Sequence, residues 1–269
     1  MPNKKKYVGN FRELKVYRKA LLYRKSIYAI VSQLPEYEQY NLADMLRKCS
    51  CSIVSNLAEG NTNYYYNKEY SHLNIALSKV AETRSLLDIA KMAGYITTTT
   101  YRSADSQGEE ILKMIIGMMK RIQHHLDLEG SNLVNKRDFN QLELNASDIS
   151  EVRKKATKFN NQILNITRQY PFTEKNNMKD QIERASKSIL NNFPVTKATS
   201  SPQLFLDLNT ALASTSECLS FLDMGIMEGY ITTNEYQALN DLGQELLDLL
   251  NNLLVQLNLN VNKEFVFNG

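Results

Sequence analysis

The chain contains one sequence pattern twice, and this repeat constrains the fold more than any other feature of its 269 residues. The stretch 47–60 returns in altered form at 183–193, with an offset of 136 residues. After one deletion the offset becomes 135, and Gly94-Tyr95-Ile96-Thr97-Thr98 returns as Gly229-Tyr230-Ile231-Thr232-Thr233. A shared run with few gaps means two copies of one module, so whatever fold the chain has must be assigned twice.

Apolar residues recur at steps of three, four and seven, which is the spacing of one helix face. Glycine and proline are scarce, at 10 and 5 residues, which also favours helices. Pro35 ends the first predicted helix, Gly60 and Gly94 follow the second and third, and the threonine run after Ile96 supplies the N-cap of the fourth. The predicted helices of the first copy span 11–33, 42–59, 68–93 and the residues from the threonine run to Leu126, and those of the second span 147–169, 175–193, 202–228 and 233–259.

Four amphipathic helices joined by mostly short connections are expected to pack as an antiparallel bundle. The sequence therefore predicts an all-α protein of two tandem up-down-up-down four-helix bundles. Copy one covers 1–127, a polar linker without apolar period covers 128–146, and copy two covers 147–260. The tail, 261–269, is either a frayed end or a small docking strand. The second helix carries many small residues, so its neighbours should approach it closely.

The net charge of +3 is unevenly distributed. Residues 1–135 hold 19 Lys and Arg against 13 Asp and Glu, whereas residues 136–269 hold 13 against 16. Within the first 25 residues, Glu13 is the single acid beside nine basic residues. Such an excess is typical of a segment that binds a polyanion.

The sequence indicates neither a membrane protein nor a protein held together by disulfides or zinc. No run of about 20 apolar residues is present, and the basic start at 1–6 is not followed by an apolar core, so we expect a cytoplasmic protein without membrane contact. Cys49, Cys51 and Cys218 have neither disulfide-framework nor zinc spacing, which predicts reduced core residues.

Catalysis finds little support in the sequence. Glu69-x-x-His72 has the spacing of a di-iron ligand pair, but such a site needs a second Glu-x-x-His and two further carboxylates. The chain has no second Glu-x-x-His, His124-His125 lacks that pattern, and copy two has no histidine. Neither a phosphate-binding glycine loop nor a nucleophile motif is visible. We expect no metal, no cofactor and no enzymatic activity.

A specific run in copy one resembles a known family. The pattern Phe11-x-x-Leu14-x-Val16-Tyr17-x-x-Ala20, then Leu46-Arg47-Lys48-x-x-x-Ser52-Ile53-x-Ser55-Asn56-x-Ala58-Glu59-Gly60, then Leu73-x-Ile75-Ala76-Leu77-x-x-x-x-Glu82 is similar to four-helix-bundle proteins encoded in intervening sequences of ribosomal RNA genes. The same family includes the accessory variability determinant of diversity-generating retroelements. Copy two departs from the pattern, with Phe193-Pro194-Val195 where Ala-Glu-Gly is expected.

The resemblance implies helical bundles that assemble into rings, commonly pentameric, with a basic surface. In the retroelement branch it also implies binding of nucleic acid and of a reverse transcriptase. Because a five-fold ring holds an odd number of bundles, fused pairs do not fill one simply: either the ring differs, or one bundle of some chains lies outside it.

The residues leave functional alternatives open. The leading hypothesis is a non-enzymatic scaffold or accessory protein that binds RNA or DNA without sequence specificity and forms a homo-oligomer; the alternative is a purely structural protein–protein assembly module. The predicted nucleic-acid contacts are Lys4, Lys5, Lys6, Arg12, Lys15, Arg18, Lys19, Arg24, Lys25, Arg47 and Lys48.

Three of these groups have structural explanations as well. The basic helix face would simply be solvated, and Arg47 and Lys48 would form an ion pair within the bundle or between subunits, for example with Glu59 or Glu82. Tyr64-Tyr65-Tyr66 would stack on bases, or would pack under the loop or at an oligomer contact, which we expect more.

Overall fold

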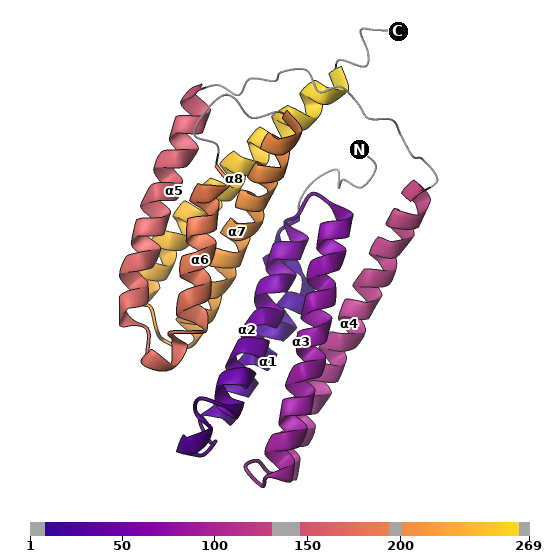
Figure 1. Cartoon of the computed structure of the whole chain (residues 1–269), viewed down its shortest axis with the longest axis vertical. Coiled ribbons are helices and arrows are strands. Elements are labelled where there is room, and N and C mark those ends of the chain that lie inside the picture. The colour runs from indigo at the N-terminus through magenta and orange to yellow at the C-terminus, as the bar shows by residue number, and fades with distance from the viewer. Residues whose placement is uncertain (1–8, 131–145, 194–200, 264–269) are drawn as a thin grey trace.

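The computed structural model describes residues 9–130, 146–193 and 201–263, and these fold into two four-helix bundles that lie side by side (Figure 1). The described chain contains eight α-helices and no strand, as the sequence predicts. Copy one consists of α1 (Lys15–Val31), α2 (Leu42–Asn61), α3 (Tyr66–Met92) and α4 (Thr98–Gly130), and copy two of α5 (Ala146–Ile166), α6 (Met178–Asn191), α7 (Ser201–Met227) and α8 (Thr233–Lys263). Short 3-10 helices at Phe11–Glu13, Glu36–Glu38, Thr167–Gln169 and Phe172–Glu174 complete the elements.

Within each bundle, every helix contacts the helices next to it along the chain, and the first contacts the fourth. The apolar stripes meet inside the bundles and form one continuous hydrophobic core across both copies, which includes Ile27, Ile53 and Ile115 of copy one and Ile163 and Leu246 of copy two. All three cysteines are buried and free, which confirms that they are reduced core residues.

The same local contacts recur in both copies, so the repeat is visible in the geometry. The Tyr95 hydroxyl donates to Glu38 over 3.1 Å, and the equivalent Tyr230 donates to Glu174 over 3.2 Å. Lys19 pairs with Glu110 in copy one as Lys155 pairs with Glu245 in copy two.

The ends of α3 and α7 are also built alike. Gly94 and Gly229 adopt φ values of 75° and 71°, a left-handed conformation that glycine takes without strain. The Tyr95 amide donates to the Ala90 carbonyl over 2.9 Å, which closes the helix in a Schellman motif. Thr97 then caps α4 by accepting from the Thr100 amide over 3.1 Å, as predicted.

The end predicted for the second helix was wrong. Gly60 lies inside α2, which continues to Asn61. A glycine is needed at this position because α3 packs closely against it, not because the helix ends there. A Cβ at Gly60 would lie 2.9 Å from Cβ of His72 on α3, so only glycine lets the two helices approach this closely. In copy two, α6 ends earlier, at Asn191, and Pro194 lies outside the described residues.

The linker and tail predictions fall mostly outside the described residues. Helix α4 extends to Gly130 and α5 begins at Ala146, so 131–145 is the part of the predicted linker between them. Helix α8 continues to Lys263, and residues 264–269, with most of the predicted tail, are likewise not described.

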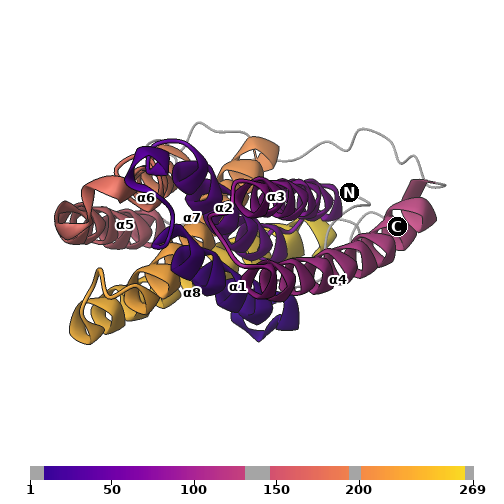
Figure 2. The same cartoon turned by 90° about the horizontal axis from the view of Figure 1, so that it is seen from below.

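The two bundles pack against each other chiefly through α2 of copy one and α7 of copy two (Figure 2). Helix α2 therefore touches α1, α3 and α7, which explains its small residues. In the repeat, α2 corresponds to α6 and α7 to α3, so the contact joins two different surfaces of the module and is heterologous.

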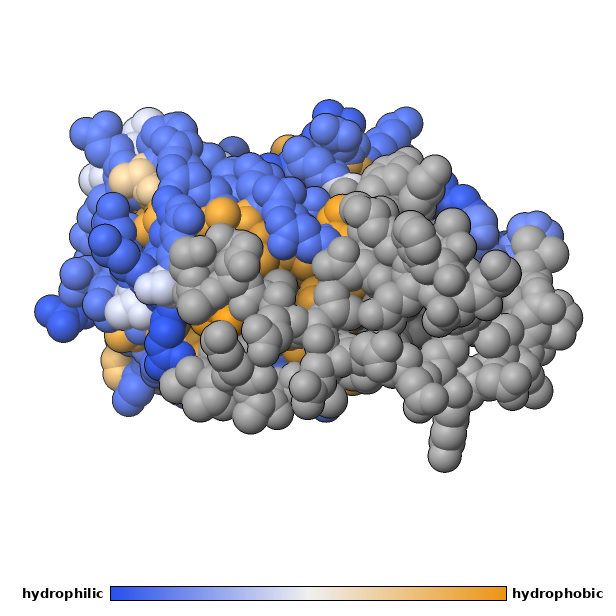
Figure 3. All heavy atoms as spheres, turned by 90° about the horizontal axis from the view of Figure 1, so that it is seen from above, coloured by the Kyte–Doolittle hydropathy of each residue, from blue (hydrophilic) through white to orange (hydrophobic). Residues whose placement is uncertain are grey.

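Hydrophilic residues cover most of the described outer surface in the view from above, and apolar side chains show through between them (Figure 3). No helix among the described residues combines the length and the apolar character needed to span a bilayer.

Candidate functional site

Five of the basic residues predicted to bind nucleic acid, in and just before α1, fall into two groups with different surroundings. Arg12, which precedes the helix, and Arg24 turn toward copy two, whereas Lys15, Arg18 and Lys25 are exposed. Lys4, Lys5 and Lys6 lie outside the described residues.

The expectation that Arg24 lies on the polar side of its helix was wrong. Its side chain is 0% exposed. The guanidinium donates to Glu228 over 2.8 Å and to the sulfur of Met178 over 3.0 Å, and it lies 3.8 Å from the centroid of the Tyr28 ring. Copy two covers this side of α1, and the periodicity of one helix does not show which of its polar positions a second bundle will cover.

Arg12 is also a contact between the bundles. Its guanidinium donates to both carboxylate oxygens of Asp223, over 2.9 and 2.7 Å, and to Asn240 over 2.8 Å. The Tyr17 hydroxyl donates to the same carboxylate over 2.8 Å. Burial, and then the negative charge of Asp223, hold the pKa of Tyr17 well above its usual range, so the phenol stays a donor.

Asp223 has a counterpart in copy one that makes only part of these contacts. Asp88 accepts a hydrogen bond from Tyr101 over 2.6 Å, as Asp223 accepts one from Tyr236 over 2.8 Å. Among the described residues, only Asp223 adds an arginine and a second tyrosine from the other bundle.

The paired basic residues of the repeated pattern have local partners. Arg47 is 7% exposed and donates to the Gln39 side-chain oxygen over 2.8 Å, so the expected pairing with Glu59 or Glu82 was wrong. Lys48 pairs with Asp44 over 2.7 Å on the surface of α2.

The tyrosine cluster after α2 packs rather than projecting into solvent. Tyr64 is 1% exposed, its amide donates to Asn209 of α7 over 2.9 Å, and its ring meets that of Phe205 edge to face. Tyr66 stacks on His125 with ring centroids 4.9 Å apart. The packing interpretation is confirmed for Tyr64, which is part of the contact between the bundles.

Glu69 and His72 have no further metal ligands grouped with them in the part of the chain that the structure describes. Glu69 is buried, and Nδ1 of His72 lies 3.1 Å from Asn56 and 3.6 Å from Glu59. Within the described ranges, no group of three or more His, Cys, Asp and Glu side chains is placed to hold a metal ion.

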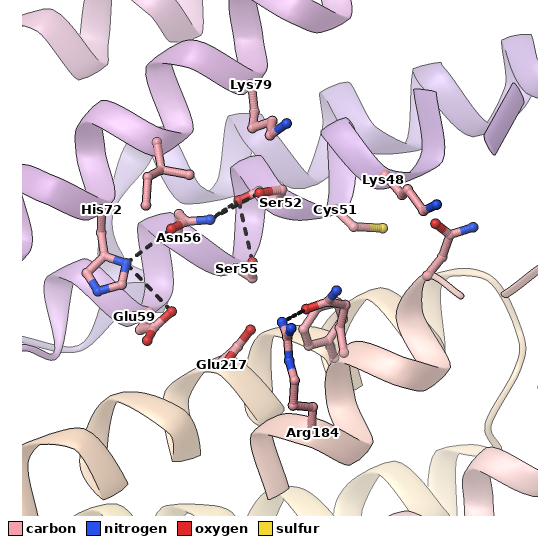
Figure 4. A pocket seen from close by; sticks show the side chains of 14 residues that line it. Lys48, Cys51, Ser52, Ser55, Asn56, Glu59, His72, Lys79, Arg184 and Glu217 are labelled. Carbon is pink, nitrogen blue, oxygen red and sulfur yellow. Dashed lines mark hydrogen bonds and ion pairs between the residues drawn. The ribbon is translucent and has the colours of Figure 1, made fainter. Parts of the chain in front are cut away.

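Sequence reasoning missed a cavity of about 420 Å³ between the bundles (Figure 4). From copy one it is lined by the polar positions of the repeated pattern on α2 together with residues of α3, and from copy two by residues of α6 and α7 and the residue before α6. The lining comprises Lys48, Cys51, Ser52, Ser55, Asn56, Glu59, His72, Ile75, Lys79, Asn177, Gln181, Arg184, Glu217 and Phe221. The sequence did contain a sign of this cavity, because one face of the second helix carries the polar residues Ser52, Ser55, Asn56 and Glu59. The cavity itself forms only where copy two covers that face.

Two carboxylates from opposite bundles line this cavity, together with the cationic side chains of Lys48, Lys79 and Arg184. Burial, and then repulsion from Glu59, raise the pKa of Glu217 to about 8. Burial also raises the pKa of Glu59, while His72 and Arg184 oppose that shift. The Glu217 carboxyl group therefore holds a proton more readily than a free carboxylate would.

The repeated bundle and its polar α2 face define a class of helical proteins, and the comparison with family models identifies it. The model of the 23S rRNA-intervening sequence protein family matches the chain twice, at residues 12–117 and 148–252. The chain belongs to this family, in tandem duplication. Searches of curated proteins and of solved structures found no match.

Proposed function

We propose that the protein is a non-enzymatic scaffold that binds RNA or DNA through the solvent-facing side of α1. The observation that carries the proposal is the row of Lys15, Arg18 and Lys25, which we call the basic face. All three are exposed, and none forms an ion pair among the described residues. Their spacing of three and seven residues places them on one side of the helix, over about 15 Å.

Five of the residues predicted to contact nucleic acid already have partners inside the protein. Arg12 and Arg24 hold the bundles together, Arg47 is enclosed, and Lys19 and Lys48 each have a carboxylate partner. Unpaired exposed cations gain most from phosphate, because no internal ion pair is lost and each neutralised phosphate releases counterions. The basic face is therefore the part of the predicted set best suited to nucleic acid.

Charge removal tests this proposal. The variant Lys15→Gln/Arg18→Gln/Lys25→Gln should lose most of its affinity for a labelled single-stranded RNA of mixed sequence, measured by fluorescence anisotropy. The slope of log affinity against log salt should become shallower by about 2, since each single-strand phosphate contact contributes about 0.7. These residues lie away from the core, so helical circular dichroism should be unchanged.

The matched control removes the same charge from the equivalent helix of copy two. Arg153, Lys154 and Lys158 are exposed on α5, and their triple change to Gln should leave binding nearly intact. Equal loss in both variants would mean diffuse charge attraction, and unchanged binding in the first would contradict the proposal.

A protein-only assembly module is the second candidate. It is favoured by the use of Arg12, Arg24 and Tyr64 inside a contact between bundles, which shows these surfaces serving packing. Absence of RNA and DNA binding, together with concentration-dependent oligomers in sedimentation, would favour this alternative. Homo-oligomerisation, a cytoplasmic location and a reverse transcriptase partner stay predictions from the sequence.

A further inference from the structure

Comparison of the two copies shows that one carboxylate of the cavity has lost its counter-ion. In copy one, Glu82 pairs with Lys79, three residues earlier, over 2.7 Å. The equivalent of Glu82 in copy two is Glu217, and three residues before it stands Ser214, whose hydroxyl donates to Ser188 over 2.9 Å. Glu217 consequently has neither a hydrogen bond nor an ion pair among the described residues.

A second carboxylate faces the same space from the other bundle. Figure 4 shows Glu59 and Glu217 extending toward the cavity from opposite walls, with Arg184 beside them. Arg184 donates to Gln181 and forms no ion pair with either carboxylate within the described part of the chain. Two like charges near one another in a partly buried space are unfavourable unless a cation or a proton lies between them.

The rest of the lining suits a short, polar organic molecule. Ser52, Ser55, Asn177 and Gln181 offer hydroxyl and amide groups, and Phe221 adds an apolar wall. The volume of about 420 Å³ lies in the range of small-ligand sites.

We propose that this cavity binds a small organic cation with a single primary ammonium group, held between the carboxylates of Glu59 and Glu217. A primary ammonium offers three donors, enough to reach both carboxylates at once. Lys48, Lys79 and Arg184 around the same cavity disfavour a second positive charge on the ligand. The site is separate from the basic face of α1 and does not depend on nucleic-acid binding.

The raised pKa of Glu217 predicts how the affinity for a cation changes with pH. Because the pKa of Glu217 is raised to about 8, its carboxyl group is mostly protonated at pH 7, and a cation must displace that proton. Affinity should increase as the pH rises from 7 to 9, and binding below pH 8 should release a proton. The charged and titratable groups that line the cavity around the pair are Lys48 and Cys51 on α2, His72 and Lys79 on α3, and Arg184 on α6. On α7, the buried thiol of Cys218 lies next to Glu217 in the chain, and the negative charges of Glu217 and Glu59 add to the burial that raises its pKa.

The probe pair 4-amino-1-butanol and 1,4-butanediol tests the proposal on the full-length protein. The two molecules have nearly the same shape and differ in the ammonium group. Isothermal titration should give saturable binding of the amino alcohol with a Kd of about 1 mM, and no saturation with the diol. Titrations in buffers of different ionisation enthalpy should reveal the released proton.

Variants locate the binding. Glu217→Gln should weaken binding of the amino alcohol about tenfold or more, since it removes a charge-assisted hydrogen bond. The control Glu245→Gln, on α8 and outside the cavity lining, should bind as the wild type does. Equal binding of both probes, unchanged affinity in Glu217→Gln, or no dependence on pH between 7 and 9 would each overturn the proposal.

Discussion

At the scale of single residues, Arg24 shows how a cation becomes part of a core. Its guanidinium meets Glu228 and the sulfur of Met178 from copy two, the sulfur of Cys51 on α2, and the face of Tyr28 on α1 itself. Removing one partner of such a buried pair leaves the other charge without compensation.

We therefore expect Arg24→Ala to lower the free energy of unfolding by about 3 kcal/mol. The control is Arg18→Ala on the same helix, which is exposed and should change stability by less than about 0.5 kcal/mol. Urea unfolding followed by circular dichroism measures both variants. Similar midpoints for the two would show that the Glu228 pair contributes nothing to stability.

The sequence predicted the apolar side chains of α1 but not the role of its arginines. Tyr17, Arg24 and Tyr28 are spaced by seven and four residues and therefore share one side of the helix. The apolar spacing predicted Tyr17 and Tyr28 to face the core, but Arg24 was expected on the polar side of the helix. Only their partners in copy two, more than 140 residues away along the chain, make this side an interior.

At the scale of helices, the close approach of α2 and α3 depends on a missing side chain. A methyl group at Gly60 would meet Cβ of His72, which cannot rotate away, so the helices would have to separate. Gly117, inside α4, has nothing within 4 Å of the position where a Cβ would stand.

These two glycines give a matched pair of substitutions. Gly60→Ala should lower the free energy of unfolding by about 1–3 kcal/mol through overpacking. Gly117→Ala should raise it by about 0.5–1 kcal/mol, because alanine favours the helix and nothing obstructs it. Thermal and urea denaturation of both variants would test this. Stabilisation by both substitutions would mean that the α2–α3 contact yields at little cost.

The helices themselves could be predicted because their signals are local. Apolar period, Thr97 as a cap and Gly94 as a terminator each depend on residues a few positions apart. Gly60 was misread for the same reason, since a glycine near the end of an apolar pattern looks like a terminator until the residue facing it is known.

At the scale of the whole molecule, the fused copies form one unit through the packing of α2 on α7 and through polar contacts. Arg12, Tyr17 and Tyr64 of copy one each bond to copy two. A protease site introduced between residues 131 and 145 should therefore yield two fragments that stay together in size-exclusion chromatography. Arg12→Ala/Arg24→Ala should make the cut fragments separate. Separation of the fragments without those changes would show that the covalent connection alone holds the bundles.

The duplication predicted two bundles but not how they pack. The cavity, the exposed basic face and the buried arginines all depend on which surface of one copy meets which surface of the other, and repeat offsets carry no information on this. One feature of the cavity did have a signal in the sequence. Lys79 stands three residues before Glu82, and copy two has Ser214 at the matching position, so Glu217 lacks the equivalent lysine partner.

The heterologous contact has a consequence for how such a gene diverges after duplication. Asp88 and Asp223 occupy the same position of the module, yet Asp223 alone receives Arg12 and Tyr17. The same substitution therefore has a different effect in each copy. Loss of Asp223 removes the carboxylate partner of Arg12, whereas loss of Asp88 removes only a hydrogen bond from Tyr101 at the surface. Fusion thus turns two equivalent copies of a module into two bundles whose matching positions carry different constraints.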